Sequence, residues 1–399
     1  MKRRQFIQML SATVTAAAVT GGRSLAANKT QRLVVFYNRG GWDTSFVFDP
    51  HFGESSIDGD PESTSLTLNG IEFADAGSRP SVRAFFERFG GSTAIVNGLR
   101  VPSISHTMGA QLLMTGRRAN DAPDITSLVA LNLGLDLPLP HLVLSGPRYP
   151  GHVSGTMVPL SFTLAGTVRG DLPEGWSGNT DHQAALDQYL SEQYSGLSQD
   201  DLLNRGLDTA WQRRQRLVDN FGLTVDRNPS ISQHISNIVL SFSQGLSCCA
   251  TLQSQMPEFA DWDSHSDNYF NQNAAYEASF VQLYQLVEAL EEASLLSTTT
   301  VMVVSEMGRT PLENSLGGKD HWPYTSAMLI GGSVEGGRVL GATDENLLGL
   351  PVDFASGLSD PAGSEVDISN LHAGLLMSMG IDHDLYFSGV APFLAPFTV

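Results

Sequence analysis

The stretch from Ser305 to Trp322 holds the densest group of residues in this chain that can bind a metal ion or a phosphate. Among its residues are Glu306, Asp320, His321 and Arg309, which supply two carboxylates, an imidazole and a guanidinium. Carboxylate oxygens and imidazole nitrogens are common ligands of divalent ions, and arginine binds oxyanions with two parallel N–H donors. The stretch directly follows the β-branched run Thr300 to Val304. Because ligand sites of open α/β proteins lie at the carboxyl ends of such strands, this position indicates a metal or phosphate site.

Three other places put metal-type ligands after a strand-like run. Asp43 closes the sequence Gly-Gly-Trp-Asp that follows Leu33 to Tyr37, and His106 comes after Ala94 to Asn97. In the third place, the sequence Trp-Asp-Ser-His, an aspartate and a histidine are separated by one residue; they are Asp263 and His265. On an extended strand these two side chains point the same way, so one strand face can present both to one ion.

Taken together, these residues predict a site for one or two divalent ions, of zinc, manganese, magnesium or calcium. The expected metal ligands are Asp43, Asp263, His265, Glu306, Asp320 and His321. Arg309 is expected to contact a bound oxyanion. The only two cysteines, Cys248 and Cys249, are too few for a zinc cage, and we expect two buried thiols in a helix. The remaining histidine candidates are assigned no chemistry. We expect His152 and His182 to lie on the surface and His372 to pack on a C-terminal helix.

Strand-like runs alternate with helical or irregular stretches along the chain, which predicts an α/β fold with a mostly parallel, doubly wound sheet sandwiched by helices. The runs are Leu33–Tyr37, Ala94–Asn97, Leu142–Leu144, Thr300–Val304 and Ala327–Ile330. The expected helices lie around Trp211–Leu217, around Ile231–Val239 and over Asn271–Ala293. The Gly/Pro/Ser-rich segment Pro147–Asn179 is expected to be a long ordered loop over the site.

The amino terminus predicts export. Residues 2–7, Lys-Arg-Arg-Gln-Phe-Ile, precede a mildly apolar run and a small-x-small cleavage site that ends at Ala26, which is typical of a twin-arginine signal peptide over residues 1–26. We therefore expect the export machinery as a partner, a periplasmic or secreted location, and a single domain over residues 27–399. Cleavage removes four basic residues and no acid, so the formal net charge falls from −19 to −23. A surface this acidic disfavours nucleic acid, and no later run is apolar enough to predict a stable membrane span in the mature protein.

These motifs resemble a group of exported bacterial proteins, family 1501 of the domains of unknown function, which is a branch of the alkaline phosphatase and sulfatase superfamily. Besides the twin-arginine start, the matching pieces are Arg39–Asp43, Trp262–His265, Ser305–Pro311, Gly317–Trp322 and the glycine pairs of Gly331–Gly337. They occur in the family's order along the whole mature chain. The resemblance implies an alkaline-phosphatase-like sandwich with one or two metal ions.

The resemblance also implies roles for individual residues. Superfamily enzymes place a Ser, Thr or formylglycine nucleophile ten residues before a Thr-Gly pair, and counting back ten from Gly116 reaches His106. His106 is then either a nucleophile that forms a phosphohistidine or a third imidazole ligand while water attacks. Among the remaining site residues, the resemblance makes metal ligands of Asp43, Asp263, His265, Glu306 and His321. Met307 stands where those enzymes carry a second histidine.

The function expected from the sequence is therefore that of an exported metal-dependent hydrolase of phosphate or sulfate esters, acting on a small-molecule or polymer substrate. A rival expectation is a catalytically retired member of the superfamily that serves as an exported binding or cell-surface protein. A phosphomutase-like enzyme is a weaker third alternative, because the chain offers no second substrate domain of the needed size.

Overall fold

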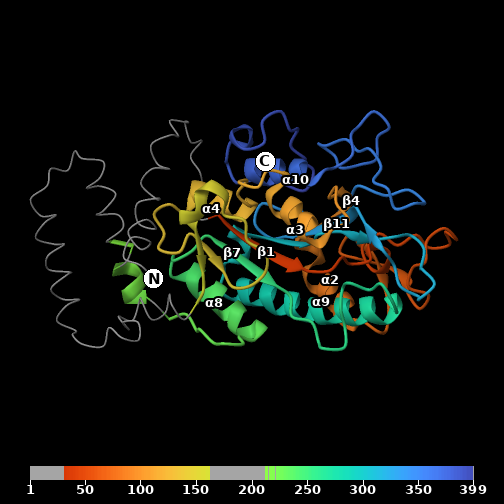
Figure 1. The fold of residues 1–399 in the computed structure, drawn as a ribbon, viewed down its shortest axis with the longest axis horizontal. Helices are drawn as coiled ribbons and strands as arrows, with labels where there is room; N and C mark the ends of the chain where they lie inside the picture. The colour runs from red at the N-terminus through yellow and green to blue at the C-terminus, as the bar shows by residue number, and fades with distance from the viewer. Residues whose placement is uncertain (1–30, 162–211, 214, 221, 399) are drawn as a thin grey trace, which may run out of the picture.

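The computed structural model describes residues 31–161, 212–213, 215–220 and 222–398 (Figure 1). The predicted signal peptide, His182, Trp211 and the part of the Pro147–Asn179 segment beyond residue 161 lie outside these residues. Within the described part of that segment, residues 151–159 form a short 3-10 helix and a strand rather than one long loop.

An eight-stranded sheet forms the centre of the described chain, in the order β12-β4-β11-β8-β1-β7-β5-β6. The strands are β1 (Arg32–Asn38), β4 (Thr93–Arg100), β5 (His141–Val143), β6 (Met157–Pro159), β7 (Cys249–Gln253), β8 (Thr299–Ser305), β11 (Tyr324–Ile330) and β12 (Arg338–Leu340). β11 runs antiparallel to β4 and β8, and the other neighbouring pairs are parallel. The predicted mostly parallel sheet is confirmed.

Helices cover both faces of the sheet, as the alternation of side chains along β1 requires. Leu33 and Val35 point into the apolar core beneath α3 (His106–Thr115), α4 (Ile125–Leu133) and α10 (Ile368–Ser378). Val34 and Phe36 point into the opposite core, beneath α2 (Pro80–Phe89), α8 (Ile231–Ser243) and α9 (Asn268–Glu292). In Figure 1 the first three helices lie above the sheet and the other three below it. β1 is buried on both faces, which explains its continuous apolar sequence.

The helices predicted at Ile231–Val239 and Asn271–Ala293 are confirmed as α8 and α9. α8 begins at a capping box formed by Ser230 and Gln233, which satisfies two backbone N–H groups at its amino end. The expected packing role of His372 is also confirmed, since its side chain is fully buried on α10.

The prediction of a helix around the two cysteines is wrong. Cys249 opens β7, a strand that pairs with β1 on one side and β5 on the other. Cys248 and Cys249 are buried free thiols, as expected. The run Cys249–Gln253 is short and has no three- to four-residue apolar repeat, and its position between two strands decides its conformation.

Smaller elements complete the described chain. They are the antiparallel pairs β2 (Thr64–Leu68) with β3 (Ile71–Asp75) and β9 (Gly308–Arg309) with β10 (His321–Trp322), and the 3-10 helices η1 (Thr44–Phe46), η2 (Gly90–Ser92), η3 (Gly151–Thr156), η4 (Leu296–Thr298) and η5 (His383–Leu385). Among the described residues, none of the helices combines the length and the apolar character that a membrane span needs.

Five consecutive strands of the sheet, β4, β11, β8, β1 and β7, supply the segments that carry the predicted site residues. β4, β8, β1 and β7 end at one edge of the sheet. β11 runs the other way, so it begins at that edge, directly after β10. The chain segments around residues 40, 106, 263, 306 and 321 therefore meet above this edge.

Candidate metal centre

Four of the predicted site residues converge above the strand ends; we call His106, Asp263, His265 and His321 the histidine–aspartate cluster. The Nε2 atoms of His265 and His321 are 3.0 Å apart. Asp263 Oδ1 lies 3.2 Å from Nε2 of His265 and 3.1 Å from Nε2 of His321. The second carboxylate oxygen of Asp263 lies 3.1 Å from Nε2 of His106.

The spacing of these atoms fits a divalent ion. In a tetrahedral zinc site with bonds of about 2.0–2.1 Å, neighbouring ligand atoms are about 3.3 Å apart. The triangle formed by His265 Nε2, His321 Nε2 and Asp263 Oδ1 has edges of 3.0, 3.2 and 3.1 Å, close to this separation. Ligand atoms of His106, Asp263 and His321 also lie within 4.8 Å of one another. The cluster therefore holds two overlapping sets of possible ligands that share Asp263 and His321. One set adds His265 and the other adds His106.

The outer nitrogen of each imidazole has its own hydrogen-bond partner. Nδ1 of His321 donates to the carbonyl oxygen of Ile104 at 2.7 Å. Nδ1 of His265 lies 2.9 Å from Asp320 Oδ1, and Nδ1 of His106 lies 2.8 Å from Glu306 Oε1. These acceptors can each take a hydrogen from Nδ1, which is the tautomer that leaves a lone pair on Nε2 for a metal ion. Such outer partners orient metal-binding histidines.

The lone pairs on the inner nitrogens favour a positively charged group between them. Nε2 of His265 and Nε2 of His321 face each other at 3.0 Å, and each also faces a carboxylate oxygen of Asp263. Lone pairs at this distance repel unless a proton or a metal ion lies between them. The donor set of nitrogens and oxygens, without thiolates, suits zinc or another first-row divalent ion.

The electrostatics of the cluster keep Asp263 ionised and His106 basic. Burial alone would raise the pKa of Asp263, but hydrogen bonds from Arg309 and His321 outweigh it and hold this pKa well below its usual value. The hydrogen bond to Glu306 raises the pKa of His106 against the opposing effect of burial. Without a metal ion, a proton therefore takes the cation's place, and metal binding must release protons.

Glu306 and Asp320, which the sequence predicts as metal ligands, lie on the outer side of the imidazoles. Glu306 is fully buried, and its oxygens accept the N–H of Gly40 at 2.9 and 3.1 Å as well as that of His106. Burial and a hydrogen bond to Glu306 raise the pKa of Tyr37. Met307, the next residue, is buried and offers no imidazole to the cluster.

Arg309, predicted to contact an oxyanion, has a fully buried side chain whose donors are used within the protein. Its guanidinium donates to the carbonyl oxygens of Gly41 at 2.9 Å, Lys319 at 2.9 Å and Trp262 at 3.0 Å, and it also contacts the carbonyl of Gly40. It bonds Asp263 Oδ1 at 2.7 Å. Arg309 thus ties together the segments that follow β1 and β7 and the segment that precedes β11. The sequence shows the guanidinium but not its burial.

Asp43 does not join the cluster. It caps η1, where Oδ1 accepts the N–H of Ser45 at 3.2 Å and its hydroxyl at 2.7 Å. Oδ2 accepts from Asn268 at 2.9 Å and pairs with Nζ of Lys319 at 2.7 Å. Lys319 was not predicted as a functional residue, and the signal that could have revealed it is its position beside Asp320 and His321 in the Gly-Gly-Lys-Asp-His sequence.

Two glycines allow the segments to approach this closely. Gly40 has a φ of +130°, and a Cβ there would lie 2.7 Å from Cβ of Trp262 and 2.8 Å from the backbone nitrogen of Asp263. A Cβ on Gly318 would lie 2.0 Å from the carbonyl carbon and oxygen of His265. Both contacts are with atoms that cannot move without moving a cluster residue.

Replacing Gly318 with alanine should therefore disrupt the site more than the fold. The added methyl group must push the segment before β10 away from His265, which separates the two Nε2 atoms that face each other. We expect the affinity for divalent ions, measured by titration calorimetry, to fall by on the order of 10- to 100-fold. Gly77→Ala is the matched control, because a Cβ at Gly77 meets nothing within 4 Å. Equal ion affinity in both variants would contradict the close approach.

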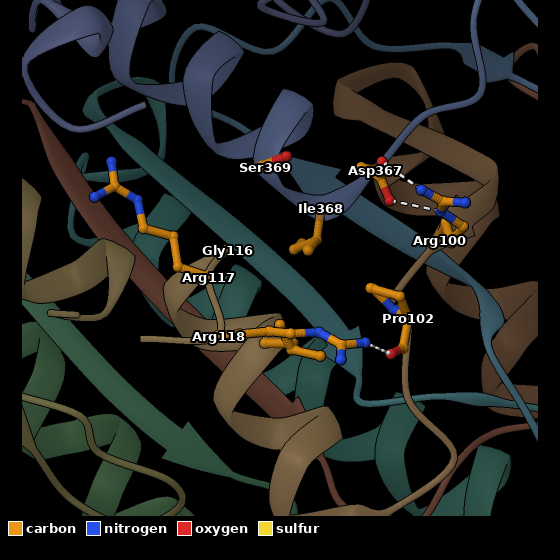
Figure 2. Close-up of a pocket in the computed structure, with 9 residues that line it drawn as sticks. Arg100, Pro102, Gly116, Arg117, Arg118, Asp367, Ile368 and Ser369 are labelled. Atoms are coloured by element: carbon orange, nitrogen blue, oxygen red, sulfur yellow. Dashed lines mark hydrogen bonds and ion pairs between the residues drawn. The ribbon is translucent and has the colours of Figure 1, made fainter. Parts of the chain in front are cut away.

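A separate hollow of about 200 Å³ lies between α3 and the start of α10 (Figure 2). Its arginines already have partners within the protein. Arg100 bonds both oxygens of Asp367 at 2.8 and 3.0 Å, and Arg118 donates to the carbonyl of Pro102 at 2.9 Å. Arg117 points away from the hollow in Figure 2, with its guanidinium 4.8 Å from the ring of Phe387. Contacts within the protein therefore account for the three arginines around the hollow.

Several solved structures are similar to this chain. They include Ps i-CgsB (13% identity, 88% of this chain and 72% of that chain covered, TM-score 0.42). A protein in the alkaline phosphatase superfamily from Vibrio parahaemolyticus is 10% identical. The match covers 100% of this chain and 80% of that chain, with a TM-score of 0.41. The lipoteichoic acid synthase LtaP from Listeria monocytogenes is 10% identical. The match covers 96% of this chain and 80% of that chain, with a TM-score of 0.41.

No curated protein matches the chain. Residues 246–392 match the family described as "Protein of unknown function (DUF1501)". This segment includes Asp263, His265, Glu306, Asp320 and His321, whereas His106 and Asp43 precede it. The resemblance to family 1501 that the sequence motifs indicate is therefore confirmed over residues 246–392.

Proposed function

We propose that this chain is a divalent-metal-dependent hydrolase of phosphate or sulfate esters. The observation that carries the proposal is the convergence of three imidazole Nε2 atoms on Asp263 while each Nδ1 is bonded to another acceptor. A hydrogen-bonded core histidine needs no such arrangement, whereas a metal ligand does. A divalent ion held there supplies a Lewis acid toward an ester oxygen.

The surroundings of the cluster suit an anionic substrate. His106 is the first residue of α3, and the side chain of Ser105, its N-cap residue, makes no capping hydrogen bond. The amino end of a helix carries partial positive charge and N–H groups without partners in the helix, which favour a bound phosphate or sulfate. This helix end can provide the oxyanion contacts that buried Arg309 does not.

Of the two roles open to His106, the geometry supports that of a ligand. Its Nδ1 is bonded to Glu306 and its Nε2 faces Asp263, so neither nitrogen is directed at open space as a nucleophile requires. In the proposed reaction His106, Asp263, His265 and His321 hold the ion, and Glu306, Asp320 and the Ile104 carbonyl orient the rings. The water that attacks the ester is then the nucleophile.

Export belongs to the same proposal. The paired arginines at positions 3 and 4 and the cleavage site that ends at Ala26 support passage through the twin-arginine machinery to the periplasm or the exterior. That route transports folded proteins, which suits a chain that acquires its ion before export. The substrate is then an ester found outside the cytoplasm, either a small molecule or part of a polymer.

The proposal is tested by the metal content and turnover of the purified protein. After treatment with a chelator and reloading with zinc, manganese, magnesium or calcium, the wild type should bind a stoichiometric ion and hydrolyse at least one member of a panel of phosphomonoesters, phosphodiesters and sulfate esters. His321→Ala should lose the ion and lower turnover by about 10³-fold or more. His152→Ala changes an exposed histidine outside the cluster and is the control.

The panel of esters also distinguishes a hydrolase from the second candidate, which is a catalytically retired binding protein. Met307 in the place of a second histidine favours that candidate, because it removes an imidazole from the site. A wild-type protein that keeps its ion and turns over no ester would support retirement. A wild-type protein that binds no divalent ion would overturn the hydrolase proposal.

A further inference from the structure

The ion pair between Asp43 and Lys319 is a second charged centre beside the histidine–aspartate cluster. Both side chains are fully buried, with 2.7 Å between Asp43 Oδ2 and Lys319 Nζ. Oδ1 of Asp43 accepts two hydrogen bonds from Ser45. Oδ2 accepts one from Asn268 and forms the ion pair with Lys319, whose Nζ makes no hydrogen bond among the described residues. Both oxygens of Asp43 are therefore engaged by protein groups, and one of these groups carries a full positive charge.

A second buried cation lies near the same aromatic ring as Lys319. The Nζ atom of Lys319 is 5.9 Å from the centroid of the Phe46 ring, and the guanidinium carbon of Arg79 is 5.8 Å from the same centroid. Arg79 is also fully buried and pairs with Asp60. A divalent ion at Asp43 would have to lie beside the Lys319 ammonium in a region of low dielectric, where repulsion between like charges is strong.

Lys319 is also tied to the cluster through its backbone. Its N–H donates to the carbonyl of Ser264 at 3.0 Å, between Asp263 and His265, and its carbonyl accepts from Arg309 at 2.9 Å. Gln272 extends the link, because it accepts the N–H of Asp43 at 2.7 Å and donates to the hydroxyl of Ser264 at 2.9 Å. These hydrogen bonds therefore hold the segments that carry the ion pair against the segments that carry the cluster.

We propose that the Lys319 ammonium takes the place of a second metal ion, so that the protein binds a single divalent ion at the histidine–aspartate cluster. Asp43 then serves as the buried counter-charge of Lys319 and not as a metal ligand, and Lys319 is a positioning residue for the site. This inference rests on the proposed function, because it assumes that the cluster holds an ion. It also decides between the one ion and the two ions that the sequence leaves open.

The test combines metal stoichiometry with a double-mutant cycle. Wild type, Asp43→Asn, Lys319→Met and the Asp43→Asn/Lys319→Met double variant are loaded with zinc or manganese, freed of excess ion by gel filtration and analysed for bound metal and thermal unfolding. We expect one ion per chain in the wild type and in the double variant. Each single variant leaves a buried charge without its partner and should lower the unfolding midpoint by on the order of 5 °C. The double variant should recover most of that loss.

Each other result overturns the inference. Two ions per chain in the wild type, with one lost in Asp43→Asn, would show that Asp43 is a ligand and would leave the hydrolase proposal intact. Loss of the ion from the double variant, or a double variant as unstable as the two single variants combined, would show that the pair does not act as a cation and its counter-charge. A wild type without any ion would overturn the proposed function itself, and this inference with it. Because the double variant removes both charges together, it keeps the test open if a single variant fails to fold.

Discussion

Replacing Arg309 with lysine is expected to lower the free energy of unfolding by about 3–5 kcal/mol and to weaken divalent-ion binding, although the positive charge is kept. The guanidinium satisfies carbonyl oxygens of the segments that follow β1 and β7 and of the one that precedes β11, and it bonds Asp263. A lysine ammonium has three donors on one atom and cannot reach these acceptors together. Buried carbonyls without donors are costly, at about 1–3 kcal/mol each. Urea unfolding and titration calorimetry measure the two effects.

Arg338→Lys is the matched control. Arg338 also donates to two carbonyls, those of Ala395 and Ser356, but its side chain is 29% exposed, so water can replace lost hydrogen bonds. This variant should lose less than about 1 kcal/mol. If Arg309→Lys kept its stability and its ion and lost only turnover, Arg309 would be an oxyanion contact, as the sequence predicts, rather than a clamp between segments.

His372 should make the fold sensitive to acid. Its ring is fully buried on α10, and in the part of the chain that the structure describes neither ring nitrogen has a hydrogen-bond partner. Burial lowers the pKa of His372 from 6.5 to about 3. Below pH 6.5 the unfolded chain binds a proton that the folded chain does not accept. Stability is therefore lost as the pH falls from about 6.5 toward 3, by about 1.4 kcal/mol per pH unit.

The comparison of wild type with His372→Leu isolates this effect. Between pH 7 and pH 4 the wild type should lose about 3 kcal/mol more than the variant, as measured by urea unfolding. Burial also lowers the pKa values of His141 and His234, but both proteins share these groups, so their contributions cancel. His152→Leu, at an exposed position, should leave the wild-type pH dependence unchanged. Parallel stability curves for wild type and His372→Leu would refute the assignment.

The sequence indicated which chain segments meet, because the ends of the strands determine that. The apolar runs that became β1, β4, β8 and β11 were recognisable, and each is followed or preceded by a residue of the site. The features of the sheet that were not predicted include the strands β6, β7 and β12 and the direction of β11. β7 was missed because its run is short, and the antiparallel direction of β11 was missed because side-chain alternation is the same in both directions.

The contacts of the individual charged residues were less predictable. A carboxylate that binds a metal and one that bonds the outer nitrogen of a histidine look alike in sequence, so Glu306 and Asp320 were predicted as ligands. Asp43 and Arg309 were predicted to face the site, yet both are buried in contacts with other parts of the chain. Burial follows from the close approach of backbone segments at positions such as Gly40 and Gly318, which only tertiary structure reveals.

The antiparallel direction of β11 also determines the order in which the site can assemble. β8 and β11 are neighbours joined by residues 306–323, so Arg309 and His321 come together as soon as β9 and β10 pair within that connection. His106 and Asp263 are 157 positions apart in the chain and lie on opposite sides of the β11–β8–β1 unit. Contacts across such long separations form late in folding. A metal ion held between them would therefore stabilise only the completed sheet, and it would slow unfolding without speeding refolding.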